Sequence, residues 1–253
     1  MLRTLASEIW KGLHYYFRDS LRVVSRIFLL RHAHSVANDA GILAGQLPGV
    51  SLSEKGREQA KGLVDRIGGV NFASVRVSPM QRCQETIDPW LQSKFGSGIG
   101  DYLLDDQIIE MDYGSWSGKK LSKLSKEKLW REIQNNPSKV TFPQGEKFTS
   151  MQKRAIKSLE SVAQEKKSTN HLLVSHGDVI KAMIAHLLKM KLDNFQSLIV
   201  DPASITVIDF DGESARLIAY NDTSSNCEKF GQIPKSMKAL LGGGAGSKSR
   251  RRR

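Results

Sequence analysis

Two histidines of this chain each follow a short apolar run, which places an imidazole where a strand would end. Arg31 and His32 follow the run Ile27–Leu30, and His176 follows the run His171–Ser175. Runs of this length and composition are typical of buried strands. Arginine offers a forked, permanent positive charge that suits phosphate oxygens, and a neutral imidazole offers a nucleophilic nitrogen. These residues predict nucleophilic chemistry on an anionic group.

Further polar residues lie at comparable places along the chain. Arg82 lies one helical turn beyond a second predicted strand, Phe72–Val77, and Glu110 lies in an irregular segment. Parallel strands place their carboxyl ends at one edge of a sheet, where open α/β sheets bind ligands. Two arginines and two histidines at that edge make a pocket for a dianionic phosphoryl group. Gly177 begins a predicted helix, whose backbone N–H groups can add to phosphate binding.

Alternating strands and helices position these side chains. This alternation predicts an α/β fold, a three-layer α/β/α sandwich with a mostly parallel central sheet. Residues 121–145 are expected to be an excursion of short helix and loop. The expected helices span Ser53–Ile67, a segment that begins near Pro79, Thr149–Lys166 and Val179–Met190, and a hairpin pairs Ile205–Phe210 with Ala215–Tyr220.

Charge and cysteine content exclude several classes of protein. The formal net charge of the 253 residues is +12, but Lys248 and Arg250–Arg253 supply five of these charges and residues 1–26 supply a net three. The body is therefore only mildly basic, and its charge does not indicate a nucleic-acid enzyme. Two cysteines are too few for a disulfide scaffold or a thiolate metal site, and they fit a reducing, cytoplasmic setting. No apolar run approaches the ~20 residues that span a bilayer.

Three segments are expected along the chain. Residues 1–25 follow helical spacing with one apolar face and predict an appended amphipathic helix. That helix could dock on the domain, form a homodimer contact or lie on an anionic membrane, or it is not made because the chain starts downstream. Residues 26–223 carry the catalytic domain. Residues 224–253 are expected to be a flexible basic tail that contacts polyanions weakly.

Four segments of the chain form an ordered set of motifs. They are Arg31-His32-Ala33 with Asn38, Ser78-Pro79-Met80-Gln81-Arg82, Glu110 through Gly118, and Ser175-His176-Gly177. Their residues, order and spacing resemble those of the histidine phosphatase superfamily, also called the phosphoglycerate mutase-like family, over about residues 27–220. Ala33 stands where the family usually has Gly, and Ser35 stands where Thr is common; neither change removes a catalytic group.

The resemblance implies a phosphoglycerate mutase-like fold and a phosphohistidine intermediate formed without a metal or an organic cofactor. It also implies a role for each matching residue. The nucleophile would be His32, and the proton donor that later activates water would be Glu110. The groups that hold the phosphoryl oxygens would be Arg31, Arg82, His176, Asn38 and the backbone at Gly177.

Other titratable residues of the chain are alternatives to the site residues named above. His34 is out of phase with the strand end and is expected to be a loop or rim residue. His14, His171 and His186 have no motif support and are expected to be structural. Asp105, Asp106 and Asp112 lie close to Glu110, which is preferred because it precedes the Tyr-Gly-x-Trp-x-Gly run.

The leading functional hypothesis is a metal-independent, acid-type phosphatase that hydrolyses a small phosphomonoester. The alternatives are a phosphoglycerate mutase-type transferase, a polyanion-binding phosphatase-like protein and an inactive scaffold. Substrate choice is expected to depend on two loops over the pocket, Gly41–Val50 and Gly114–Glu146.

Overall fold

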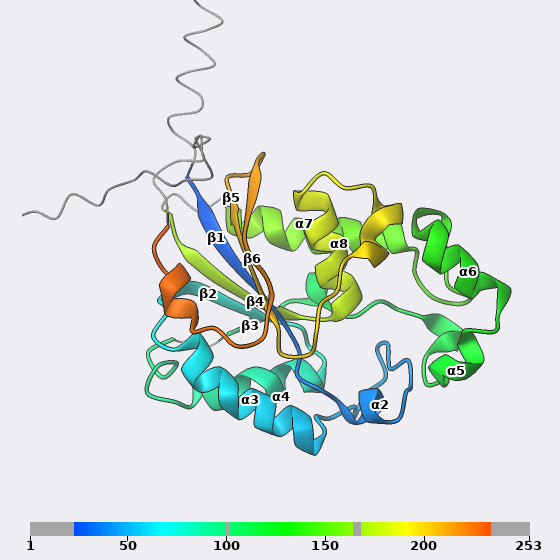
Figure 1. Ribbon diagram of the computed structural model, residues 1–253, viewed down its shortest axis with the longest axis horizontal. Helices are drawn as coiled ribbons and strands as arrows, with labels where there is room; N and C mark the ends of the chain where they lie inside the picture. Colours follow the sequence, from blue (N-terminus) through cyan, green and yellow to red (C-terminus); the bar gives the residue numbers. More distant parts are fainter. Residues whose placement is uncertain (1–22, 100–101, 164–167, 234–253) are drawn as a thin grey trace, which may run out of the picture.

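The computed structural model describes residues 23–99, 102–163 and 168–233 (Figure 1). Its centre is a six-stranded sheet, whose strands are β1 (Ser25–Arg31), β2 (Phe72–Val77), β3 (Leu103–Leu104), β4 (Asn170–Ser175), β5 (Ile205–Phe210) and β6 (Ala215–Asp222). Their order across the sheet is β3-β2-β4-β1-β5-β6. The first four strands pair in parallel, and β5 and β6 are added antiparallel at one edge. The predicted mostly parallel sheet is confirmed.

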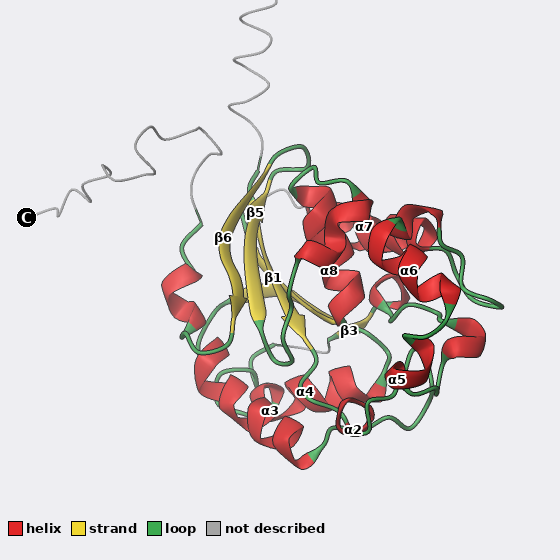
Figure 2. Ribbon diagram, turned by 45° about the vertical axis from the view of Figure 1, so that its right-hand side comes forward, coloured by secondary structure: helices red, strands yellow, loops and turns green. Residues whose placement is uncertain are grey.

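Helices cover both faces of the sheet (Figure 2). Side chains alternate across β1, so that Phe28 and Leu30 enter one apolar cluster while Ile27 and Leu29 enter the other. The first cluster packs under α3 (Glu54–Ile67) and α4 (Gln81–Leu91), and the second packs under α7 (Phe148–Ala163) and α8 (Gly177–Leu187). The short helices are α2 (Val36–Asp39), α5 (Leu121–Leu124) and α6 (Lys128–Asn135). The predicted three-layer sandwich is therefore confirmed.

Local chemistry sets several of the element ends. Ser53 caps α3, because its Oγ accepts a hydrogen bond from the Gly56 N–H at 3.2 Å. The helix expected near Pro79 begins at Gln81, with Met80 as its N-cap. Helix α8 begins at Gly177, as expected for the helix that follows His176, and two residues before the apolar stretch that begins at Val179. Short 3₁₀ segments connect the rest: η1 (Asp106–Ile108), η2 (Gly114–Trp116), η3 (Pro137–Lys139), η4 (Leu192–Ser197) and η5 (Cys227–Phe230).

The register of the parallel strands brings three chain segments to one edge. Arg31 pairs with Ser175, while Val77 and Leu30 both lie opposite Val174. The next residue along each strand, which is His32, Ser78 or His176, therefore leaves the sheet at nearly the same level.

The last described residues pack on the domain instead of leaving it at residue 224. The short helix η5 lies against α3 and buries Cys227. Arg26 donates hydrogen bonds to the carbonyl oxygens of Phe230 and Gln232. The folded domain thus reaches at least to residue 233, and the predicted tail boundary falls too early.

The helix predicted for residues 1–25 lies outside the described residues up to position 22, while Ser25 already belongs to β1. Within the described ranges, no helix has the length and apolar character needed to cross a membrane.

Candidate active site

His32 lies at the end of β1 as a buried, neutral imidazole. Its side chain is 4 % exposed. Its Nδ1 lies 2.8 Å from the carbonyl oxygen of Ala33. A carbonyl can only accept, so Nδ1 carries the proton and Nε2 keeps its lone pair. Burial, followed by the positive charges of Arg82 and Arg31, lowers the pKa of His32 well below its ordinary value. The ring is therefore a ready nucleophile near neutral pH.

Arg82 reaches from α4 to the centre of the site and is 1 % exposed. Its Nε lies 3.3 Å from Nε2 of His32, and its Nη2 lies 2.9 Å from the Gly45 carbonyl oxygen and 3.2 Å from Nδ1 of His176. Its buried Nη1 has no hydrogen-bond partner among the described residues. A buried guanidinium with an unsatisfied N–H is costly unless an anion completes it.

Arg31, the last residue of β1, resembles Arg82 in having both satisfied and unsatisfied guanidinium N–H positions. Its Nη1 donates to the Val200 carbonyl oxygen at 2.6 Å, while its buried Nε finds no partner in the part of the chain that the structure describes. Gly177 lies directly beside it, since a Cβ added at that glycine would be 3.4 Å from the Arg31 guanidinium carbon. Two arginines that line the same pocket thus each have an unsatisfied buried N–H group.

His176 is held in one orientation by Ser78. Nε2 of His176 lies 2.7 Å from Oγ of Ser78, and both residues are fully buried. Nδ1 faces Nη2 of Arg82, which can only donate, so Nδ1 accepts and Nε2 carries the proton toward Ser78. Burial and then Arg82 lower the pKa of His176 well below its ordinary value. The ring can take a second proton when an anion arrives beside it.

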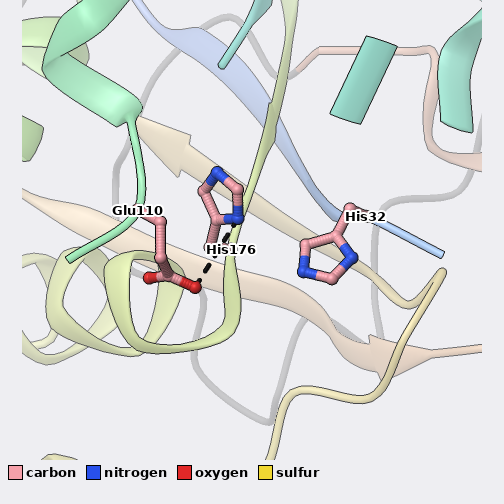
Figure 3. Close-up of side chains that lie close together, drawn as sticks. All are labelled: His32, Glu110 and His176. Atoms are coloured by element: carbon pink, nitrogen blue, oxygen red, sulfur yellow. Dashed lines mark ion pairs between the residues drawn. The ribbon is translucent and has the colours of Figure 1, made fainter. Parts of the chain in front are cut away.

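The Glu110 side chain faces His176 and Arg82 from the segment between η1 and η2. Its Oε2 lies 3.6 Å from Nδ1 of His176 and 3.9 Å from Nη2 of Arg82, and its Oε1 accepts from the Met111 N–H at 2.9 Å. Figure 3 shows Glu110 and His176 facing each other, with the His32 ring beside them. Burial raises the pKa of Glu110 to about 7. This carboxyl can therefore both give and take a proton near neutrality.

These groups lie at the inner end of an open pocket of about 480 Å³. Asn38 lines it from α2, where its Oδ1 accepts from the Ser35 N–H and lies 2.9 Å from the Ser35 Oγ. Because this oxygen is committed to capping the helix, the amide nitrogen is the group left to donate to a ligand. The loops predicted to cover the site contribute Ile42–Gly45 and Leu121 to the lining.

The structure brings together every residue that the sequence predicts for the site. Of the four acidic residues between positions 105 and 112, all of them described, Glu110 alone lines the pocket. His34 does not line it and lies with Nδ1 3.0 Å from the Ser53 Oγ. His171 lies between Ser74 and Thr169, as expected for a structural histidine. The predicted site residues that line the pocket are Arg31, His32, Asn38, Arg82, Glu110 and Gly177, with His176 in contact behind them.

Sequence reasoning missed other residues of the same pocket. Tyr113 donates from its hydroxyl to Oδ2 of Asp178 at 2.9 Å, and Nζ of Lys181 lies 3.1 Å from Oδ1 of Asp178. Asp178 and Lys181 lie on the first turns of α8, so their closeness to His176 is readable from helical spacing. The sequence indicates Ser78 only as part of a motif. Its contact with His176 joins residues 98 positions apart, so no local pattern predicts it.

A metal ion does not suit this cluster. One ligand atom from each of His32, Glu110 and His176 lies within 4.8 Å of the others, a spacing that a metal could use. The Arg82 guanidinium, however, lies 3.3 Å from Nε2 of His32 and 3.2 Å from Nδ1 of His176. A fixed positive charge there opposes a cation and favours an anion.

Fold and site together define an α/β protein that binds a phosphoryl-type anion beside a nucleophilic imidazole at the carboxyl edge of its sheet. The sequence pattern of the histidine phosphatase superfamily (branch 1) matches residues 27–223, and the chain belongs to that superfamily.

Curated relatives and solved structures agree with this assignment. Phosphoserine phosphatase 1 of Hydrogenobacter thermophilus is 30% identical over 200 residues, which cover 78% of this chain and 92% of that protein. The 2,3-bisphosphoglycerate-dependent phosphoglycerate mutase of Thermoplasma acidophilum is 28% identical over 198 residues, covering 78% and 94%. The crystal structure of the alpha-ribazole phosphatase from Shigella flexneri superposes with a TM-score of 0.69 at 25% identity, covering 79% of this chain and 98% of that one. The protein is an enzyme whose relatives include phosphatases and mutases.

Proposed function

We propose that this protein is a phosphomonoester hydrolase that works through a phosphohistidine formed on His32. One observation carries the proposal: Arg31 and Arg82, each with an unsatisfied buried N–H group, line one pocket with the neutral, buried imidazole of His32, whose Nε2 lies 3.3 Å from Nε of Arg82. A phosphoryl group satisfies those donors and places phosphorus within reach of the ring nitrogen.

The first step transfers the phosphoryl group to the enzyme. Nε2 of His32 attacks phosphorus, the bond between phosphorus and the ester oxygen breaks, and Glu110 gives its proton to the departing alcohol. The developing charge on the equatorial oxygens is held by the remaining donors of the pocket, which are Arg31, Arg82, His176, Asn38 and the Gly177 N–H. Positioning and electrostatics of this kind supply most of the rate in phosphoryl transfer.

The second step regenerates the enzyme. The Glu110 carboxylate takes a proton from a water molecule, whose oxygen attacks the phosphohistidine and breaks the bond to Nε2. Inorganic phosphate leaves, and His32 and Glu110 return to their starting protonation states. A carboxyl with a pKa of about 7 suits both halves of this cycle.

The His32→Ala variant tests the proposal. Phosphate release from p-nitrophenyl phosphate should fall by about 10³-fold or more, because His32 is the nucleophile that accepts the phosphoryl group and no other described residue of the pocket lining is proposed to replace it. His34→Ala is the matched control, since His34 lies on the same loop but outside the pocket. An His32→Ala enzyme as fast as its parent contradicts the mechanism.

We propose that the reaction needs no metal ion, since Arg82 supplies the positive charge beside both histidines. Exhaustive treatment with EDTA, followed by assay in metal-free buffer, should leave kcat for p-nitrophenyl phosphate within about twofold of its starting value. A loss that added Mg²⁺ or Zn²⁺ restores contradicts this part of the proposal.

A phosphoglycerate mutase is the second candidate, because the Thermoplasma acidophilum relative is named as one. Incubation with 3-phosphoglycerate separates the two functions. The hydrolase releases inorganic phosphate, whereas a mutase produces 2-phosphoglycerate.

A further inference from the structure

The outer half of the pocket is walled by apolar side chains from three separate segments. They come from the loop after α2, from α5 and from the loop after η4, and they are Ile42, Leu43, Leu121, Leu198, Ile199 and Val200. Ile199 is 64% exposed and Leu121 is 39% exposed. Large apolar side chains exposed on the walls of one pocket gain free energy when an apolar ligand covers them.

The charged residues of this outer half leave no free cation for a second anion. In this part of the described pocket lining the cationic residue is Lys181. Its Nζ lies 3.1 Å from Asp178 Oδ1 and 2.8 Å from Gln196 Oε1. The same Nζ lies 4.8 Å from the centre of the Phe195 ring. Asp178 therefore already balances the charge of Lys181.

A second carboxylate, that of Asp201, adds a negative charge to the pocket lining. Asp201 lines the pocket and is exposed, and its Oδ2 accepts a hydrogen bond from the neutral amide of Asn221 at 2.7 Å. An acidic group on the leaving alcohol would meet this charge, which no ion pair neutralises among the described residues, although the Arg31 guanidinium lies within electrostatic reach of it. The arginines at the inner end are committed to the phosphoryl group itself.

We propose, on the basis of the function proposed above, that the preferred substrates are phosphomonoesters of alcohols whose body is apolar and carries no negative charge. A pocket of about 480 Å³ falls in the range that holds an organic molecule and not a phosphate ion alone. The apolar walls bind the body of the alcohol, and Asp201 disfavours acidic alcohols.

A matched pair of esters tests the preference for an uncharged alcohol. Benzyl phosphate and 4-carboxybenzyl phosphate have similar leaving oxygens and differ by one carboxylate on the ring. We expect kcat/KM for benzyl phosphate to exceed that for 4-carboxybenzyl phosphate by about tenfold. The Asp201→Asn variant should reduce this ratio toward one. Equal or faster turnover of the carboxylated ester by the wild type overturns the proposal.

Variants of the apolar walls test the preference for an apolar body. Ile199→Ser and Leu121→Ser should each lower kcat/KM for benzyl phosphate by about tenfold and leave that for ethyl phosphate nearly unchanged. Leu217→Ser is the matched control, because Leu217 is 40% exposed on β6 and does not line the pocket. Wall variants that turn over both esters like the parent overturn this part.

Binding of two phosphonates separates failure of this inference from failure of the proposed hydrolase. Benzylphosphonate and 4-carboxybenzylphosphonate are not hydrolysed, so calorimetric Kd values measure the same preference without turnover. Tighter binding of benzylphosphonate together with no phosphate release from any ester supports the inference and contradicts the hydrolase. Equal binding together with normal phosphatase activity overturns the inference alone.

Discussion

Buried ionisable side chains do the chemistry of this site, and burial sets their protonation states. His32 and His176 have lowered pKa values because the charged imidazolium is poorly solvated beside Arg82. Glu110 has a raised pKa for the corresponding reason, since its carboxylate is poorly solvated. The free enzyme therefore holds a neutral nucleophile and a protonated acid together just below neutral pH.

The raised pKa of Glu110 predicts the direction of the pH dependence. The carboxyl holds its proton below pH 7 and loses it above, so kcat/KM for an alkyl ester should fall as the pH rises through about 7. Glu110→Gln should lower kcat/KM for benzyl phosphate by about 10²–10⁴-fold and abolish this decline. The loss should be smaller for the transfer step of p-nitrophenyl phosphate, whose leaving group needs no proton.

Asp106→Asn is the control for this change, because Asp106 is exposed in the same segment and does not line the pocket. The measurement is a pH–rate profile of the three proteins. A decline near pH 7 that persists unchanged in Glu110→Gln would assign that proton to another group.

Secondary-structure elements hold the site residues in position relative to the apolar core. The loop that carries His32 is pinned to α3, since the Ser53 N–H donates to the His34 carbonyl oxygen at 2.9 Å. Helix α3 approaches this loop so closely that only glycine fits at position 56. A Cβ there would lie 1.8 Å from the same carbonyl oxygen. The position of the nucleophile thus depends on a helix that contributes no side chain to the pocket.

Two glycines of α3 provide a matched test of this dependence. Gly56→Ala should lower the free energy of unfolding by about 1–3 kcal/mol and reduce kcat, because the loop beside His32 must move. Gly62→Ala has open space around its Cβ and should raise stability by about 0.5–1 kcal/mol with kcat unchanged. Urea unfolding and p-nitrophenyl phosphate turnover measure both effects. A Gly56→Ala protein as stable and active as its parent would contradict the packing.

Across the whole molecule, the two ends of β1 serve different purposes. Arg31 at one end belongs to the pocket, whereas Arg26 at the other forms a buried ion pair with Asp209 of β5. The two bonds of this pair are 2.6 Å and 2.9 Å long. Arg26 also donates hydrogen bonds to the carbonyl oxygens of Phe230, the last residue of η5, and of Gln232 beyond it. The end far from the pocket therefore ties the two ends of the domain together.

Asp209→Ala should separate stability from chemistry. Removing one partner of a buried pair leaves an uncompensated charge, so the free energy of unfolding should fall by about 3–5 kcal/mol. Turnover per folded molecule should be unchanged, since five residue-to-residue steps along an extended strand, ~16 Å, separate Arg26 from Arg31. Thermal unfolding and active-site titration with vanadate measure the two quantities. The double variant Arg26→Met/Asp209→Leu should regain part of the lost stability, and a double variant weaker than the single would contradict this account.

Much of the fold follows from local patterns. The strand Phe72–Val77 and the strand Ile205–Phe210 have the bounds that their composition predicts, and Ser53 caps its helix as expected. Local rules fail where the partner is distant. Strand β3 has two exposed residues and shows no periodicity, and β1 extends back to Ser25 because the adjacent Arg26 is buried against a residue 183 positions away.

For the site too, local patterns predict some features and contacts between distant segments decide the others. The types and order of Arg31, His32, Arg82, Glu110 and His176 were readable from the chain, because each follows a recognisable strand or motif. Their protonation states, the unsatisfied guanidinium N–H groups and the place of Asp201 in the pocket lining were not. Those properties depend on burial and on charges brought together from distant segments, and a local pattern of residues carries no record of either.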